Sequence, residues 1–226
     1  MQGKKLLIVG DGEFAAIAFE YFTHDAGREV VGFAVERAYL KKSELFGLPV
    51  IALEDVESRF APARHDAFVA ITYTQLNRVR ARLCGIVKAK GYALTSYISS
   101  KAFVWRNAVI GENCFIFEMN VVQYGARIAN DVVLWSGNHI GHQAVVGEHC
   151  FLSSHVVVSG YCHIGESCFL GVNSTLGDRV KVGRDTIIGA GAVVLKNVGD
   201  RQVMRGNPAV HAGIDSFRVF GVKVES

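Results

Sequence analysis

Eight histidines occur in the chain, and one of them, His142, stands where an imidazole could act as a general base. An imidazole changes charge near pH 6.5, so it can accept a proton from an amine or a hydroxyl close to neutral pH. His142 comes two residues after Ile140, just past Gly141, at a position typical of a corner. If three six-residue repeats form one coil of eighteen residues, Tyr124 and Gly160 stack on the coils before and after His142. The glycine then leaves space beside the imidazole.

The other histidines in the second half of the chain are less suited to catalysis. His139 and His163 directly precede aliphatic residues, so they are expected to face outward from flat strands. His149 and His155 fall in predicted turns, where surface or interface roles fit them better. Proteins with coils of this kind that bind zinc hold the ion with histidines about two coils apart. No two of these histidines have that spacing, so we predict no metal.

Every sixth residue from Ile98 to Val194 is aliphatic, without exception. A helix repeats every 3.6 residues and a strand every two, so a period of six means that one face recurs after a whole structural unit. The residue two places earlier is small or short, and the following residue is often glycine, which permits a tight corner. This pattern predicts an all-β parallel β-helix with three hexapeptides in each triangular coil and roughly five coils.

The inward columns of such a prism fill its interior, so a functional site must lie on a face, at a corner or between subunits. Asn138 belongs to the small inward column, where we expect it to bond the backbone of its coil. Cys84 is expected to pack on a helix. The other four cysteines occupy the small column and are predicted to be core residues, not disulfides or metal ligands: Cys114, Cys150, Cys162 and Cys168.

Residues 1–95 show a different pattern, in which short apolar strands alternate with helical spacing. The alternation predicts a small α/β domain with a parallel sheet of Rossmann-like character. No Pro- or Ser-rich linker follows it, so we expect the two domains to pack together. The expected strands are 4–9, 30–35, 50–53 and 68–71, and the expected helices are 15–22 and 76–90.

The carboxyl ends of these strands are a candidate nucleotide site. Gly10 and Gly12 follow the first strand and suit a turn that brings backbone amides to a phosphate, although the third glycine of the dinucleotide pattern is absent. Glu36 follows the second strand, where such folds often place a ribose-binding acid. Thr72 and Tyr73 follow the fourth strand at the same edge. A plain tight turn, or a helix N-cap with a packed aromatic, would also explain the glycines and the Thr-Tyr pair.

Composition limits the partners of the chain. Its 226 residues are half hydrophobic and carry a formal net charge of +3, so strong binding to nucleic acid or to an acidic membrane is not expected. The sequence opens without a charged-then-apolar leader and holds no run of the ~18 apolar residues that a membrane span needs. We therefore expect a cytoplasmic protein.

The chain resembles the left-handed β-helix acyltransferases. Among them it is similar to the bacterial nucleotide-sugar N-acetyltransferases of glycan or O-antigen assembly, a group close to the sialic-acid O-acetyltransferases. The resemblance rests on the strand–Gly10-x-Gly12–helix start and on the segments 142–148 (HQAVVGE), 189–194 (GAGAVV) and 206–209 (GNPA). It implies a sugar-nucleotide domain at 1–95, a left-handed β-helix acetyltransferase domain at 96–209 and a tail at 210–226.

In that family the corner histidine is the general base, which implies that His142 deprotonates a sugar amine as the amine attacks acetyl-CoA. The family often has a glutamate next, where this chain has Gln143, whose carbonyl can accept the imidazole N–H without adding charge. It also often has a histidine where this chain has Phe14. The resemblance further implies a homotrimer, with acetyl-CoA in a groove between neighbouring prisms and contacted by Gly171, Gly189, Ala190 and Arg205.

Two rival functions stay open at this point: a sugar O-acetyltransferase, and a non-catalytic β-helix that binds sugar nucleotides. Gln143 weighs mildly against O-acetylation, because a hydroxyl needs stronger base assistance than an amine. The sequence does not choose the amino sugar, the position of its amine, the nucleotide (UDP, dTDP or GDP) or the acyl group.

Overall fold

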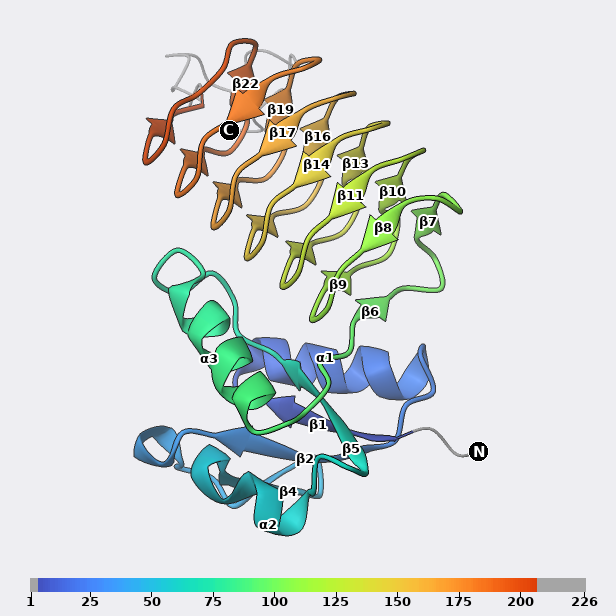
Figure 1. Ribbon diagram of the computed structural model, residues 1–226, viewed down its shortest axis with the longest axis vertical. Coiled ribbons are helices and arrows are strands. Elements are labelled where there is room, and N and C mark those ends of the chain that lie inside the picture. Colours follow the sequence, from blue (N-terminus) through green and yellow to red (C-terminus); the bar gives the residue numbers. More distant parts are fainter. Residues whose placement is uncertain (1–3, 207–226) are drawn as a thin grey trace, which may run out of the picture.

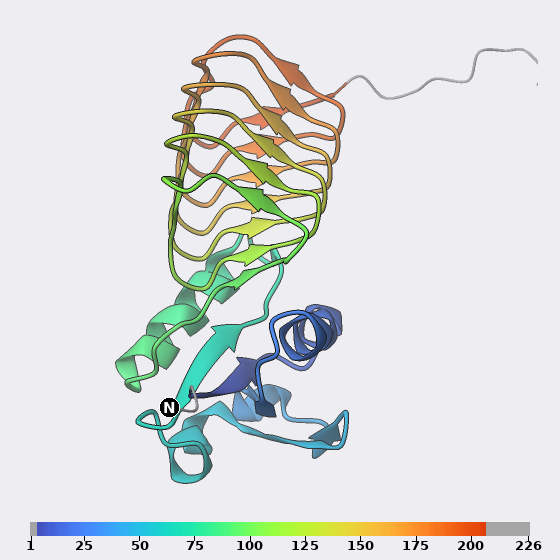
Figure 2. The same ribbon diagram turned by 90° about the vertical axis from the view of Figure 1, so that its right-hand side faces the viewer.

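The computed structural model describes residues 4–206, which form an α/β domain beside a stack of triangular coils (Figures 1 and 2). The sheet of the domain has the strand order β3-β4-β2-β1-β5, in which only β3 runs antiparallel to its neighbour. No helix within 4–206 is long and apolar enough to cross a bilayer. The domain comprises β1 (Lys5–Val9), α1 (Glu13–His24), β2 (Val30–Val35), η1 (Arg37–Tyr39), β3 (Glu44–Leu45), β4 (Leu48–Ala52), η2 (Leu53–Asp55), α2 (Val56–Arg59), β5 (His65–Val69) and α3 (Arg78–Ala89).

Each strand and helix expected in the front part is confirmed to within a few residues, while the short elements η1, β3, η2 and α2 were not expected. Helix α1 forms where apolar side chains recur on one face. Phe14, Ala18 and Phe22 are buried at a spacing of four residues, so they lie along a single stripe of the helix. The stripe is what holds α1 between its sheet and the coils.

The hexapeptide register is confirmed, because coil strands up to β22 (Val193–Val194) pair in parallel with strands eighteen residues away, as Val121 does with His139. In the last pair, Ile187 meets Val203. The strands form three sheets, which we call faces I, II and III. Face I holds β6 (Tyr97–Ile98), β9 (Phe115–Ile116), β12 (Val133–Leu134), β15 (Phe151–Leu152), β18 (Phe169–Leu170), β21 (Ile187–Ile188) and β23 (Val203–Met204). Face II holds β7 (Phe103–Val104), β10 (Val121–Val122), β13 (His139–Ile140), β16 (Val157–Val158), β19 (Thr175–Leu176) and β22 (Val193–Val194). Face III holds β8 (Val109–Ile110), β11 (Arg127–Ile128), β14 (Val145–Val146), β17 (His163–Ile164) and β20 (Lys181–Val182).

Both inward columns fill the prism as the sequence predicts. The aliphatic column and the small column together form one buried cluster that runs through the coils. Asn138 is 1% exposed, donates to the Trp135 carbonyl (2.6 Å) and accepts from the Val156 amide (2.7 Å). It therefore serves the backbone of the coils, because a buried amide needs its hydrogen bonds satisfied.

The corner glycines have a different role from the one expected. Gly141 and Gly147 do not adopt positive φ angles; the left-handed residues lie two places further on, at Gln143 and His149. A Cβ atom on Gly141 would instead lie 2.7 Å from the amide nitrogen of Gly160 in the next coil. Glycine is required here because the coils approach one another too closely for a side chain, not because the corner needs a special dihedral.

All five cysteines are buried and unpaired, as predicted. Burial raises the pKa of the Cys114 thiol to about 11, and burial together with nearby Asp131 raises the pKa of Cys84 further. A hydrogen bond with Cys150 lowers the pKa of Cys168, but the Cys168 side chain is fully buried, so a reagent does not reach it. Because thiolates are the reactive form and all five thiols are buried, we expect the native protein to resist a thiol reagent such as dithionitrobenzoate at pH 8. Five thiols should react after unfolding. Rapid labelling of one thiol in the native protein would contradict the packing described here.

The α/β domain and the coils share one aromatic core. Phe115 on face I lies 5.3 Å from Phe14 and 5.9 Å from Phe22 of α1, measured between ring centroids. Phe68 of β5 stands 5.4 Å from the same ring. The outward side chains of face I continue this contact to later coils through Phe151. The expected packing of the two parts against each other is therefore confirmed.

Candidate active site

His142 lies at the corner between faces II and III, just after β13, and its side chain is exposed. Its backbone amide donates to Gln123 Oε1 (3.0 Å) in the preceding coil, which fixes the corner. The imidazole lies over Gly160, as the eighteen-residue spacing predicts. A Cβ atom on Gly160 would lie 2.7 Å from His142 Nε2, so any larger residue would displace the ring.

Three further side chains surround this space. The Tyr161 ring meets His142 edge to face, with centroids 5.1 Å apart. The Arg179 guanidinium lies over the Tyr161 ring at 4.4 Å and pairs with Asp178 through Nε and Oδ2 (3.3 Å). The corner thus presents an imidazole nitrogen that is open to solvent and bordered by these side chains, so an acceptor could come within hydrogen-bond distance of it, as general base catalysis requires.

Gln143 does not lie against His142. Its backbone has a φ of 57°, and its side chain lies over Gly125, where a Cβ atom would come within 2.6 Å of Gln143 Nε2. Within residues 4–206 no hydrogen bond joins the two side chains. The expectation that the Gln143 carbonyl orients the imidazole therefore does not match this geometry, because the left-handed corner turns the amide toward the preceding coil.

A pocket of about 340 Å³ opens beside the N-terminus of α1, between the domain and the coils. Thr72 and Tyr73 line it, as do Glu13 and Phe14 from the first turn of α1. The coils contribute Phe151 from face I and four residues from the corner between faces I and II: Trp135, Ser153, Ser154 and Val172. The pocket is therefore at a different corner from His142.

The loop between β1 and α1 has the form of a phosphate-binding turn. Gly10 has a φ of +124°, and a Cβ atom there would lie 2.8 Å from the Ala70 carbonyl oxygen, so only glycine fits. Gly12 is the N-cap of α1 and provides no side chain to bond the first helical amides. Such free amides at a helix start attract anions.

Two of the other predicted nucleotide contacts are engaged within the chain. Glu36 receives two hydrogen bonds from Arg82, of 2.7 and 2.8 Å, and this pairing holds the pKa of Glu36 below its usual value. A ribose would have to share these oxygens. Tyr73 packs its ring edge to face against Phe151 (5.0 Å) and Phe169 (4.9 Å), yet remains half exposed at the pocket.

The predicted CoA contacts gather at the corner between faces I and II, away from His142 of the same chain. Gly171 and Gly189 stack on adjacent coils, and a Cβ atom on Gly171 would lie 2.6 Å from the Ala190 amide nitrogen. Arg205 is exposed near the end of the described chain. Residues 207–209 of the GNPA segment and the tail at 210–226 lie outside the described residues.

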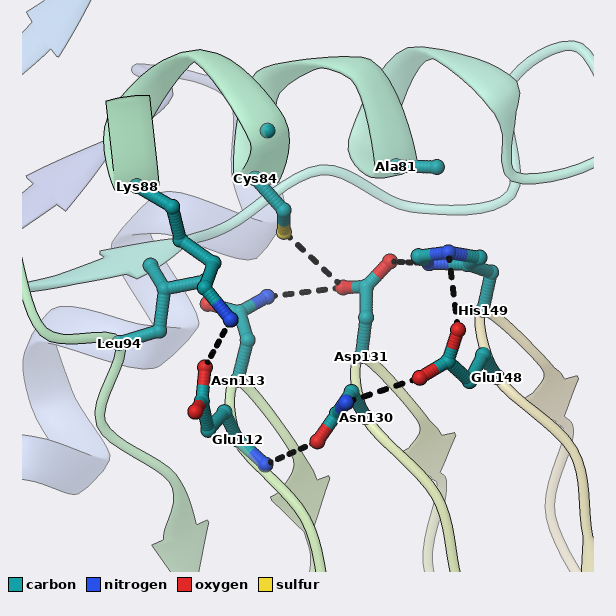
Figure 3. A pocket seen from close by; sticks show the side chains of 11 residues that line it. Ala81, Cys84, Lys88, Leu94, Glu112, Asn113, Asn130, Asp131, Glu148 and His149 are labelled. Atoms are coloured by element: carbon teal, nitrogen blue, oxygen red, sulfur yellow. Dashed lines mark hydrogen bonds and ion pairs between the residues drawn. The ribbon is translucent and has the colours of Figure 1, made fainter. Parts of the chain in front are cut away.

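A second pocket, of about 250 Å³, lies where α3 meets the corner between faces III and I (Figure 3). Its centre is Asp131, whose carboxylate binds Arg80 Nε (2.8 Å), Asn113 Nδ2 (2.8 Å) and His149 Nδ1 (2.8 Å). Arg80 also donates to the Cys150 carbonyl (3.2 Å). This network was not expected from the sequence, which predicted only a surface or interface role for His149.

The network joins the two domains and does not resemble a reaction centre. Lys88 pairs with Glu112 (2.7 Å) and Asn130 with Glu148 (2.8 Å), so the polar side chains around the pocket bind one another (Figure 3). Over residues 4–206, no group of three or more His, Cys, Asp or Glu side chains is arranged to hold a metal ion.

The chain is similar to known proteins in its repeats and in its fold. The family profile of the bacterial transferase hexapeptide (six repeats) matches residues 125–160 and 161–196. A variant of perosamine N-acetyltransferase from Caulobacter crescentus, solved with CoA and GDP-perosamine, is 25% identical at a TM-score of 0.82, covering 93% of this chain and 97% of that one. The acetyltransferase domain of PglB from Neisseria gonorrhoeae, solved with acetyl coenzyme A, is 24% identical at a TM-score of 0.80, covering 92% and 99%. WeeI from Acinetobacter baumannii is 20% identical at a TM-score of 0.76, covering 91% and 98%.

Proposed function

We propose that this chain, which carries hexapeptide repeats and is similar in fold to bacterial sugar N-acetyltransferases of the left-handed β-helix type, transfers an acetyl group from acetyl-CoA to the amine of a nucleotide-linked amino sugar. The perosamine enzyme, which is similar over nearly its whole length, was solved with CoA and a GDP-linked amino sugar. The exposed imidazole of His142, which lies over Gly160, is the single observation that supports this reaction most directly.

His142 is the general base in the proposed reaction. The imidazole takes a proton from the protonated sugar amine, and the amine nitrogen then attacks the thioester carbonyl. The C–S bond breaks, and CoA leaves as the thiol after taking a second proton from that nitrogen. Backbone amides stabilise the oxyanion that forms on the carbonyl oxygen. Gln143 lies away from the ring in the described chain, so we assign it no direct part in this step.

The α/β domain at 1–95 is proposed to be a Rossmann-like holder of the sugar nucleotide, and 96–209 the acetyltransferase domain. The helix start at Gly10 and Gly12 supports a phosphate site, and the adjoining pocket with Thr72 and Tyr73 has room for the rest of the nucleotide. Glu36 is a weaker candidate for the ribose, because Arg82 already occupies both of its oxygens.

We propose that the enzyme is a homotrimer, because the proposed CoA and nucleotide contacts of one chain lie at a different corner from its His142. The CoA contacts Gly171, Gly189, Ala190 and Arg205 and the nucleotide pocket lie toward the corner between faces I and II, whereas His142 lies at the next corner. A neighbouring prism packed beside this corner would bring its own His142 to the groove between the two prisms. Face II, between the two corners, exposes apolar side chains that such a contact would cover: Phe103, Val157 and Val193. The proposed compartment is the cytoplasm, where acetyl-CoA is available.

The test is a thiol-release assay with acetyl-CoA and a panel of acceptors. GDP-perosamine, UDP-linked and dTDP-linked amino sugars are compared with matching sugars that carry a hydroxyl in place of the amine. We expect release of CoA with at least one amino sugar and an acetylated amine in the product. Turnover of hydroxyl acceptors alone would show O-acetylation. Binding of sugar nucleotides without any turnover would show a non-catalytic protein.

Gly160→Ala should abolish most of the activity without unfolding the protein. The added methyl group would occupy the space beside His142 Nε2 and drive the ring from its position, while both neighbouring side chains are exposed and free to move. We expect kcat to fall by about 10²-fold, as misplacement of a catalytic group commonly causes. Gly199→Ala is the matched control, because its Cβ atom would meet only the end of the Gln202 side chain. Full activity of Gly160→Ala would contradict the placement of the base.

A further inference from the structure

Asp178 borders the space over Gly160 on the side opposite His142, and the reaction proposed above does not use it. Asp178 stands two coils after His142 at the same corner, and its Oδ1 would lie 3.0 Å from a Cβ atom on Gly160. His142 Nε2 would lie 2.7 Å from that same atom. The base nitrogen and a carboxylate oxygen therefore face each other across a residue that has no side chain.

Four side chains that contact one another in turn surround this space. Asp178 Oδ2 pairs with Arg179, whose guanidinium lies on Tyr161, whose ring in turn meets His142. The other carboxylate oxygen, Oδ1, has no hydrogen-bond donor among residues 4–206. Arg179 pairs with one oxygen of the exposed carboxylate, and the other oxygen faces the space over Gly160.

An acceptor amine has the chemistry that this pair would recognise. At neutral pH an aliphatic amine is largely an ammonium ion, which has no free electron pair for attack until it loses a proton. A carboxylate binds that cation with a charge-assisted hydrogen bond, and a neutral imidazole beside it can take the proton. A sugar hydroxyl carries no charge, so it gains much less from the carboxylate.

We propose that Asp178 binds the ammonium group of the acceptor in the space over Gly160 and selects amines over hydroxyls, an inference that rests on the proposed function. One ammonium proton passes to His142, and the freed electron pair forms the C–N bond to the thioester carbon. The C–S bond then breaks, and a second proton from the nitrogen goes to the departing CoA thiolate.

The test is Asp178→Asn, assayed with the amino-sugar nucleotide that the wild type acetylates fastest in the panel above. We expect the KM for this acceptor to rise about tenfold, with kcat changed less than about threefold, because a charged hydrogen bond is lost from an exposed site. The hydroxyl analogue of the same sugar nucleotide should inhibit the variant and the wild type with the same Ki. Asp178→Glu should restore part of the affinity for the amine.

Glu166→Gln is the matched control, because it removes one exposed carboxylate from a different corner, and its kinetics should equal those of the wild type. An unchanged KM in Asp178→Asn would overturn this role while leaving the proposed function intact. An equal loss of affinity for the amine and for its hydroxyl analogue would overturn the selection of amines. Wild-type turnover of hydroxyl acceptors alone would overturn the function, and with it this inference.

Discussion

His142→Ala is expected to lower kcat by about 10²- to 10⁴-fold, the range that removal of a general base commonly produces. The KM for acetyl-CoA should change little, since the imidazole acts on the amine and not on the CoA carrier. Steady-state thiol release with the best amino-sugar acceptor measures both constants. The expected pattern is a loss confined to turnover, in a protein that unfolds like the wild type.

His163→Ala is the matched control, because His163 is an exposed histidine on a strand of face III, away from the corner of His142. It should keep wild-type kinetics. Equal activity of His142→Ala and the wild type would remove His142 from the mechanism and direct attention to a base supplied by the substrate or by another corner of the prism.

Arg80→Met, which breaks a buried ion pair, is expected to lower the free energy of unfolding by about 3–5 kcal/mol. Arg80 is fully buried, and its partner Asp131 is only 2% exposed. Removing the guanidinium leaves the carboxylate buried beside Asn113 and His149 and takes a hydrogen bond from the Cys150 carbonyl. Urea unfolding followed by circular dichroism measures the change.

Arg82→Met on the same helix is the comparison. Arg82 pairs with Glu36 at the surface and is 49% exposed, so its loss should cost less than about 1 kcal/mol. The double variant Arg80→Met/Asp131→Leu should recover part of the stability, since no unpaired charge stays buried. A double variant as unstable as Arg80→Met would show that lost packing, not the unpaired charge, is the cause.

The periodic part of the structure could be predicted almost completely from the sequence. The six-residue register assigned the inward columns, the burial of Cys114 and Asn138, and the stacking of His142 against Gly160, because each depends only on counting residues along coils. The corner glycines were placed correctly but explained wrongly. Periodicity does not tell a special dihedral from a close approach of two backbones.

The contacts between separate elements could not be predicted. Arg80 and Asp131 are far apart in the chain, and nothing in a helical pattern distinguishes a buried arginine from the exposed Arg82 near it. The directions of Gln143 and Glu36 likewise depend on neighbours that only the folded chain supplies. Asp178 stands two coils from His142, and only the missing side chain of Gly160 on the coil between them brings both to one space.

The aromatic contact between Phe115 and helix α1 has a consequence for how the protein is made. Ribosomes deliver the N-terminus first, so the α/β domain can fold before any coil has emerged. Its ring cluster then offers a ready surface for the first strands of face I, and each later coil needs only its predecessor as a template. The domain that is proposed to hold the sugar nucleotide would thus also be the seed from which the solenoid grows.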